Sequence, residues 1–144
     1  LRQDGQPDLA RIGNGGGQTL ISYGHALAGL VDYSVVPASH LDWLDALPLM
    51  HVDQHRVFVH AWVDSSVPLD RQKPQKVMWE LYPAGASYGH RLTGRHVVHG
   101  HHQFEDGPKL YKGRTDLDTF AWYTGRIVVG IFDDTVPGGP IDIS

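Results

Sequence analysis

The stretches Arg56-Val57-Phe58-Val59-His60 and His96-Val97-Val98-His99-Gly100-His101 decide the fold of this chain. Each contains a short run of β-branched or aromatic residues, which favour strands, and each leads into a histidine. A strand fixes its backbone, while the loop that follows leaves the imidazole accessible to a cation. We therefore predict two strands here, with His60 and His101 as candidate metal ligands at their ends.

The residues before the first stretch predict a helix and a hairpin. Pro37 suits a first helical turn, and three leucines recur at every third position after it, so we expect a short amphipathic helix over 36–47 that ends at Pro48. The runs 49–53 and 56–60 flank a polar turn, which is typical of two paired strands. This part of the chain therefore predicts a helix followed by a hairpin.

The rest of the chain contains short strand-like runs separated by glycine or polar turns. A proline-containing segment, 65–76, predicts a surface loop, and the apolar residues 77–79 predict a brief helix after it. We expect a mostly antiparallel sheet, and the fold class is α+β. Its expected strands after the hairpin are 96–100, 109–112, 115–119 and 126–132.

Length and composition exclude several classes of protein. The chain has 144 residues, a formal net charge of −4 and no cysteine. This length suits a single domain, with a loop-rich lead-in over 1–35, a main body over 36–134 and an irregular tail over 135–144. Its scattered cations do not predict a nucleic-acid surface, and its apolar runs are far shorter than the roughly 20 residues of a membrane span. The absence of cysteine is compatible with the cytoplasm, where we expect the protein to act.

Two motifs carry a resemblance to a known family. Val57-Phe58-Val59-His60-Ala61 and Val97-Val98-His99-Gly100-His101 are similar to the last two metal motifs of calcineurin-like metallophosphoesterases. The later segment 113–126 is similar to the strand pair that follows in bacterial serine/threonine protein phosphatases of that family. The resemblance covers roughly residues 15–134. It implies a layered β-sandwich with flanking helices, of which this chain is the C-terminal portion, with the N-terminal half of the fold missing.

The resemblance also implies a metal site and a reaction. Family members use two divalent cations, Mn, Fe or Zn, to activate water for attack on phosphate monoesters. His60 and His101 would bind the second cation. Asp64, His99 and Asp118 are candidates for the outer shell that orients these imidazoles. The substrate would be a phosphorylated protein or a small phosphoester, and diadenosine polyphosphates are a related possibility.

The sequence departs from the family pattern at several positions. Trp62 and Phe120 stand where the family has glycine, and Glu80 stands where an arginine would clamp phosphate. The three early motifs, which supply the bridging aspartate and most ligands, are absent from this sequence. We therefore expect at most one weakly held cation and little phosphatase activity from this chain alone.

Two other interpretations of the sequence stay open. One is a catalytically degenerate, phosphatase-like module that binds a partner or forms a homodimer through exposed sheet edges. The other is a sugar-binding β-domain that uses its four tryptophans, although core packing is the commoner use of such residues. Alternation along the strands predicts that His99 and His102 face solvent and that Asp116 and Asp118 form a surface ladder.

Overall fold

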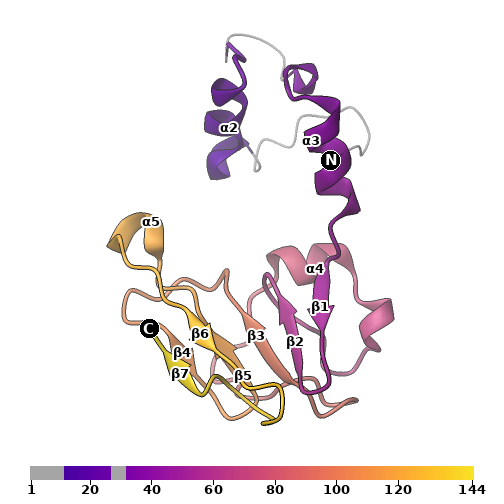
Figure 1. The fold of residues 1–144 in the computed structure, drawn as a ribbon, viewed down its shortest axis with the longest axis vertical. Coiled ribbons are helices and arrows are strands. Elements are labelled where there is room, and N and C mark those ends of the chain that lie inside the picture. The colour runs from indigo at the N-terminus through magenta and orange to yellow at the C-terminus, as the bar shows by residue number, and fades with distance from the viewer. Residues whose placement is uncertain (1–11, 27–31) are drawn as a thin grey trace. The chain divides into compact units, whose positions relative to one another are not determined.

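The computed structural model describes residues 12–26 and 32–144, and the chain divides into two compact units, 1–47 and 48–144. Figure 1 shows both units, which we describe separately. The sequence predicted a boundary between lead-in and main body after residue 35, whereas the boundary between the two compact units falls after Leu47. Parts of the lead-in, 1–11 and 27–31, lie outside the described residues.

The first unit contains short helical segments. The segment η1 (Ile12–Gly16) has non-helical backbone at Asn14 and Gly15 and leads into α2 (Gly17–Ser22), so within the expected loop residues 17–22 are helical. A 3-10 turn, η2 (Tyr33–Val35), precedes α3 (Ala38–Ala46), which confirms the helix predicted over 36–47. Pro37 lies at the N-cap of α3 rather than in its first turn, and no α3 residue is buried.

The second unit is built on an open five-stranded sheet with the order β1-β2-β3-β5-β4. Strands β1 and β2 form the predicted hairpin. The Asp53 carboxylate stabilises its turn by accepting hydrogen bonds from the backbone N–H groups of His55 and Arg56. The strands are β1 (Met50–Val52), β2 (Arg56–Val59), β3 (His96–His99), β4 (Lys109–Leu110) and β5 (Arg114–Asp116).

The expectation of a mostly antiparallel sheet is wrong for its centre. Strand β3 pairs in parallel with β2 on one side and with β5 on the other, and only the outer pairs are antiparallel. The connection from β2 to β3 is long enough for the crossover that parallel neighbours need. All four residues of β3 are buried, which is typical of a strand covered on both faces.

The crossover from β2 to β3 covers one face of the sheet. It contains the 3-10 turn η3 (Leu69–Arg71) and the helix α4 (Pro74–Trp79), which includes the last three residues of the segment expected to be a loop. Val77 of α4 is fully buried, and its carbonyl accepts a hydrogen bond from Ala61 N–H at 2.9 Å. The hydrophobic core of this unit contains Val57, Val63, Tyr82, Ala86 and Val97.

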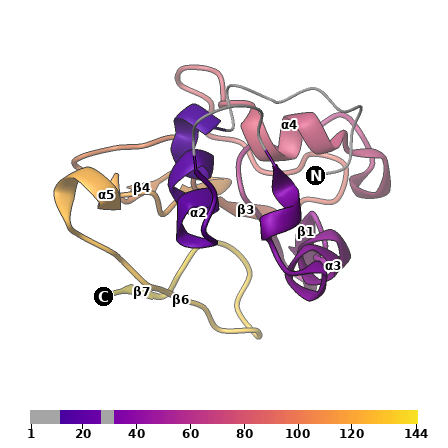
Figure 2. The same cartoon turned by 90° about the horizontal axis from the view of Figure 1, so that it is seen from above.

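A C-terminal ribbon covers part of the other face. After the short helix α5 (Ala121–Thr124), strands β6 (Gly130–Ile131) and β7 (Asp142–Ile143) pair antiparallel. The expected strand over 126–132 is therefore much shorter, and the tail is not wholly irregular. Figure 2 shows α4 and the ribbon on opposite sides of the sheet. Phe132, which follows β6, packs edge-on against Phe58 of β2 with ring centroids 5.4 Å apart.

A buried arginine ties this ribbon to the sheet. The Arg56 side chain is fully buried and donates hydrogen bonds to the carbonyl oxygens of Asp133, Val136 and Gly138, which lie between β6 and β7. The second unit is thus a mixed α+β fold with a helix, a sheet and a small ribbon in layers. Within the described residues, none of the helices is both long enough and apolar enough to cross a bilayer.

Candidate metal site at the strand ends

The structure brings the two histidines from the sequence motifs together. Because β2 and β3 are parallel neighbours, His60 and His101 follow them at the same edge of the sheet. The backbone N–H of Gly100 donates to the carbonyl of His60 at 3.0 Å, so the two segments stay paired just beyond the strands. The two imidazole centroids lie 4.9 Å apart. We call His60 and His101 the histidine pair.

The loop conformation of His101 sets the orientation of its ring. His101 has a φ of 66°, a left-handed conformation that turns the chain out of β3. Its Nε2 lies 3.1 Å from the carbonyl oxygen of Trp79, and the ring contacts the Trp79 indole edge-on. A carbonyl can only accept, so Nε2 carries the proton in neutral His101 and Nδ1 carries the lone pair. An oxygen that fixes the tautomer in this way is typical of metal-binding histidines.

The electrostatics of His60 favour a neutral ring. Desolvation by the surrounding protein atoms and the adjacent His101 ring lower the pKa of His60, whereas the negative charge of Asp118 acts in the opposite direction. Asp118 lies beside the pair: its Oδ2 is 3.8 Å from the position that a Cβ on Gly100 would occupy. Its Oδ1 accepts a hydrogen bond from Phe120 N–H. Of the three candidate outer-shell residues, Asp118 is therefore the one that the structure places against the pair.

Asp64 and His99 have other partners. The Asp64 carboxylate accepts hydrogen bonds from the backbone and the hydroxyl of Ser66, and it lies 3.7 Å from the Lys76 ammonium. His99 is only 4% exposed, so the expectation that it faces solvent is wrong. The reason is that β3 is covered on both faces, so that alternation moves a side chain from one buried layer to another.

His99 belongs to a buried polar cluster that the sequence did not predict. We define this polar cluster as His99, Arg114 and Asp116, each of which is at most 4% exposed to solvent. Arg114 donates to His99 Nε2 at 2.8 Å and to the carbonyl of Ala86 at 2.9 Å. Its guanidinium also lies 3.7 Å from the centre of the Tyr111 ring. The surface ladder expected for Asp116 is therefore wrong, because β5 is an inner strand of the sheet.

The carboxyl and the imidazole of the polar cluster do not form an ion pair. His99 Nδ1 and Asp116 Oδ2 lie 3.6 Å apart, which is too long for a hydrogen bond. Burial lowers the pKa of His99 to about 4 and raises the pKa of Asp116 to about 7. Asp116 Oδ1 accepts a hydrogen bond from Asp118 N–H, while Oδ2 is buried without a partner. The cluster thus holds a neutral imidazole beside a carboxyl that binds a proton easily.

The two bulky departures from the family pattern have distinct environments. The Trp62 ring lies under the Lys76 ammonium, 4.6 Å from the ring centre, and packs edge-on against Tyr82. Phe120 has a φ of 60°, a conformation that glycine adopts most easily, and its ring contacts Trp122 and Tyr123. A phenylalanine therefore holds a backbone conformation suited to the glycine that the resemblance led us to expect.

The histidine pair supplies only part of the ligand set that a cation needs. Among residues 12–26 and 32–144, no group of three or more His, Cys, Asp or Glu side chains is arranged to hold a metal ion. Two neutral imidazoles can supply two ligands, and water would have to supply the others. Among these residues, no carboxylate joins the two imidazoles in a group that could bridge two cations. The described residues therefore do not fit the two-cation centre of the resembling family.

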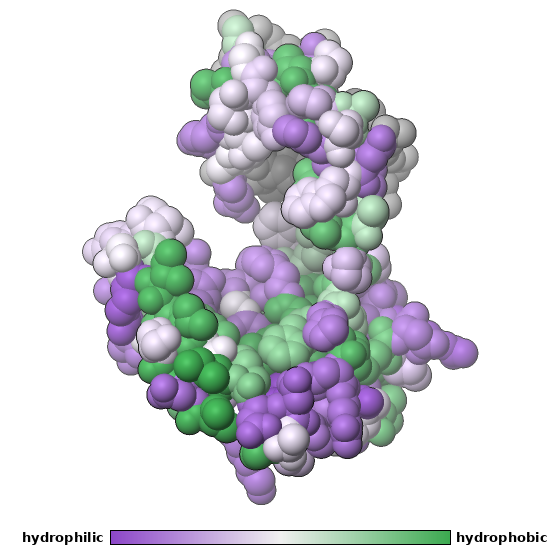
Figure 3. All heavy atoms as spheres, in the orientation of Figure 1, coloured by the Kyte–Doolittle hydropathy of each residue, from purple (hydrophilic) through white to green (hydrophobic). Residues whose placement is uncertain are grey.

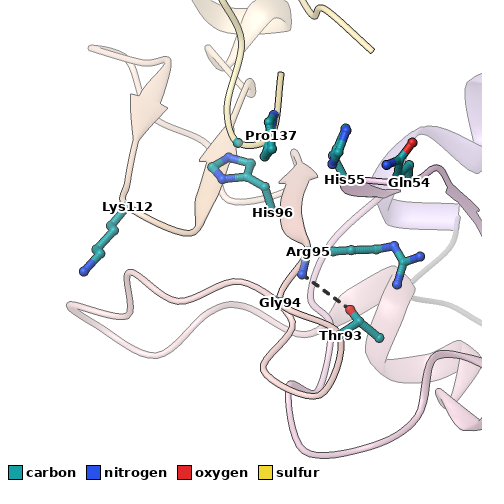
Figure 4. A pocket seen from close by; sticks show the side chains of 9 residues that line it. Gln54, His55, Thr93, Gly94, Arg95, His96, Lys112 and Pro137 are labelled. Atoms are coloured by element: carbon teal, nitrogen blue, oxygen red, sulfur yellow. Dashed lines mark hydrogen bonds between the residues drawn. The ribbon is translucent and has the colours of Figure 1, made fainter. Parts of the chain in front are cut away.

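A polar pocket lies at the opposite end of β2 and β3 (Figure 4). It has a volume of about 340 Å³ and contains Arg95 and Lys112 but no carboxylate. Figure 4 shows these two cations extending in opposite directions, so their charges do not converge on one ligand. The other lining residues are Gln54, His55, Thr93, Gly94, His96, Pro137 and Gly138.

Comparisons of the chain with protein-family models, with curated proteins and with solved structures found no match.

Proposed function

We propose that this chain supplies two ligands, His60 and His101, for the second cation of a metallophosphoesterase-like site. The reaction served by that site would be the hydrolysis of phosphate monoesters. The observation that carries the proposal is the convergence of His60 and His101 from two adjacent parallel strands, with ring centroids 4.9 Å apart. The carbonyl of Trp79 orients one ring, and Asp118 lies beside the other. These are the features that a metal-binding histidine pair needs.

Two further observations support the resemblance. The left-handed conformation of Phe120 follows the Asp118-Thr119 dipeptide, at the position where the family has glycine. Strand β5, which carries the third family-like segment, pairs directly with β3. The proposed substrates are a phosphorylated serine or threonine in a protein, or a small phosphoester. The proposed location is the cytoplasm, which the lack of cysteine favours.

The proposal includes weak metal binding and little turnover by this chain alone. In such enzymes a pair of cations supplies an activated water and neutralises the phosphoryl oxygens. The described residues supply two imidazoles and no bridging carboxylate. What this chain contributes is the orientation of His101 by Trp79 and the negative charge of Asp118 near His60.

Metal titration tests the proposal directly. Calorimetry with Mn²⁺ and Zn²⁺ should show one weak site in the wild-type chain, and both His60→Ala and His101→Ala should abolish it. His51→Ala is the matched control, because His51 is also an exposed histidine of the same sheet, but it lies within β1 and its ring contacts Phe58. Binding that persists in both pair variants would contradict the site.

An activity assay separates a partial site from a complete one. With p-nitrophenyl phosphate and Mn²⁺, we expect no turnover above that of the His60→Ala variant. Robust metal-dependent turnover by the wild-type chain would show that a bridging carboxylate is present after all, and would contradict the assignment of a partial site.

The second candidate function is a degenerate, self-associating module. The sheet leaves two edge strands, β1 and β4, each with one neighbour in the sheet. Leu110 of β4 is 61% exposed, so this edge presents an apolar side chain as well as free backbone groups. A dimer that binds no Mn²⁺ or Zn²⁺ and that Leu110→Asp dissociates would favour this candidate over the metal site.

A further inference from the structure

The outer face of the β6–β7 ribbon and of α5 is exposed and apolar. Residues 119–132 contain a single charged residue, Arg126, and its guanidinium is already bonded to the carbonyls of Glu105 and Gly107. Figure 3 shows a band of hydrophobic residues on the side where Figure 1 draws β6 and β7. We define the ribbon face by its exposed fractions: Trp122 78%, Tyr123 63%, Ile127 79%, Val129 57%, Ile131 43% and Ile141 58%.

Exposure alternates along residues 127–132, of which β6 occupies only 130–131, and this alternation explains why the outer face is apolar. Ile127, Val129 and Ile131 are exposed, whereas the alternate residues Val128, Gly130 and Phe132 are partly buried. A Cβ on Gly130 would lie 3.1 Å from the Phe132 ring and 3.3 Å from Leu117, which shows that this inner side is packed. The ribbon is therefore held to the sheet by one side and presents three β-branched side chains on the other.

The size of the ribbon face exceeds what an isolated chain ordinarily exposes. At roughly 150–250 Å² for each fully exposed side chain of this size, the exposed fractions correspond to on the order of 800 Å². The largest apolar patch on a monomer is about 300–600 Å², and a standard protein interface buries about 800 Å² on each partner. One standard interface would therefore cover the whole ribbon face.

We propose that the ribbon face packs against the ribbon face of a second copy of this chain, as a face-to-face homodimer. An apolar surface is complementary to itself, so a two-fold axis can bring two identical copies together without opposing charges on these six side chains. Asp142 is opposite Ile131 in the ladder, so its carboxylate is on the same side of the ribbon as Ile131 and would have to lie at the rim of the interface. The dimer does not depend on the metal site.

This arrangement differs from pairing through sheet edges. If two copies joined edge to edge, their outer faces would lie side by side and stay in water. Face-to-face packing, by contrast, stacks the two ribbons about 10 Å apart and removes both apolar faces from solvent. A charged substitution on the ribbon face should therefore disrupt only a face-to-face dimer, and one on the sheet edge should disrupt only an edge-paired dimer.

Light scattering coupled to size exclusion tests the dimer. The wild-type chain should have twice its mass of 16.0 kDa at micromolar concentration. Ile127→Asp should raise the dimer dissociation constant at least about 10-fold, because it places two carboxylates in an apolar interface. Leu110→Asp and Leu92→Asp are matched controls, since these leucines are 61% and 58% exposed outside the ribbon face, and both should stay dimeric.

Circular dichroism and the melting temperature of dilute protein should be the same for Ile127→Asp and the wild type, because the Ile127 side chain touches little of its own chain. A monomeric wild type would overturn the proposal. So would an Ile127→Asp variant that remains dimeric, or dissociation by Leu110→Asp with Ile127→Asp unaffected, which would indicate edge pairing instead.

Discussion

The histidine pair and the polar cluster are two neighbouring regions with opposite environments. His101 is only two residues beyond His99, and Asp118 is two residues beyond Asp116. His99 and Asp116 are buried and face each other across the β3–β5 ladder, whereas His60 is exposed and His101 is partly exposed beyond the strands. The difference shows that the end of a strand separates structural polar residues from residues that are free to bind a ligand.

The polar cluster contributes to the fold, so the largest effect is expected there. Arg114→Met keeps the apolar stem but leaves His99 Nε2 and the Ala86 carbonyl buried without a donor. Two such orphaned groups should cost about 3–5 kcal/mol of the free energy of unfolding. Urea denaturation measures this loss.

Arg91→Met is the matched control for this comparison. The Arg91 guanidinium also lies over a tyrosine ring, 4.4 Å from the centre of Tyr88, but its side chain is exposed. We expect Arg91→Met to lower the free energy of unfolding by less than about 0.5 kcal/mol. Equal losses for the two variants would mean that burial does not distinguish the cluster from the surface.

The next largest effect concerns Asp116 and depends on pH. Burial raises the pKa of this carboxyl from 3.8 to about 7, so between these values the folded chain holds a proton that the unfolded chain has released. The stability contributed by Asp116 is therefore present at low pH and is lost as the pH rises through this window. Asp116→Asn removes the effect, so the free energy of unfolding of the variant should rise by about 3 kcal/mol relative to wild type between pH 5 and pH 8.

The difference in the free energy of unfolding between wild type and Asp116→Asn, measured at each pH, isolates the effect of the Asp116 carboxyl. His96 and His99, whose pKa values burial lowers to about 4, titrate in the opposite sense and are present in both proteins. Their contribution cancels in the difference between Asp116→Asn and wild type. A difference that does not change between pH 5 and pH 8 would mean that Asp116 is ionised in the fold.

The smallest effect is expected at the histidine pair. The exposed ring of His60 makes no hydrogen bond with the described residues, so His60→Ala should change the free energy of unfolding by less than about 0.5 kcal/mol. The same variant should abolish the weak metal binding. A loss of stability as large as that of Arg114→Met would make His60 a structural residue and would remove the contrast between the two regions.

Much of the local structure could be predicted from the sequence. The hairpin forms because Asp53 satisfies two backbone donors at a turn between apolar runs, and such signals are local. The positions of His60 and His101 after strands could also be predicted, because β-favouring runs precede them. The helix over 36–47 was visible from its leucine spacing, although α3 buries none of its residues in the described structure.

The directions and the burial of the strands could not be predicted in the same way. A short apolar run such as Val97-Val98 fits a parallel or an antiparallel strand, because direction depends on where the connecting segment leads. Asp116 looked like a surface carboxylate because alternation says which residues share a face, but not whether that face is covered. Strand β6 lies inside the strand expected over 126–132, whereas β7 was missed because it is only two residues long and lies in the tail expected to be irregular.

Three features are encoded locally: histidines follow short strands, an aspartate closes a hairpin, and residues 119–132 carry few charges. Each of these features depends on residues within a few positions of one another. Three others arise from the folded arrangement: β2, β3 and β5 run parallel, the two imidazoles lie together, and His99 and Asp116 are buried. The physical reason is that those outcomes depend on interactions between distant segments, such as the hydrogen bond from Arg56 to Gly138 across 82 residues.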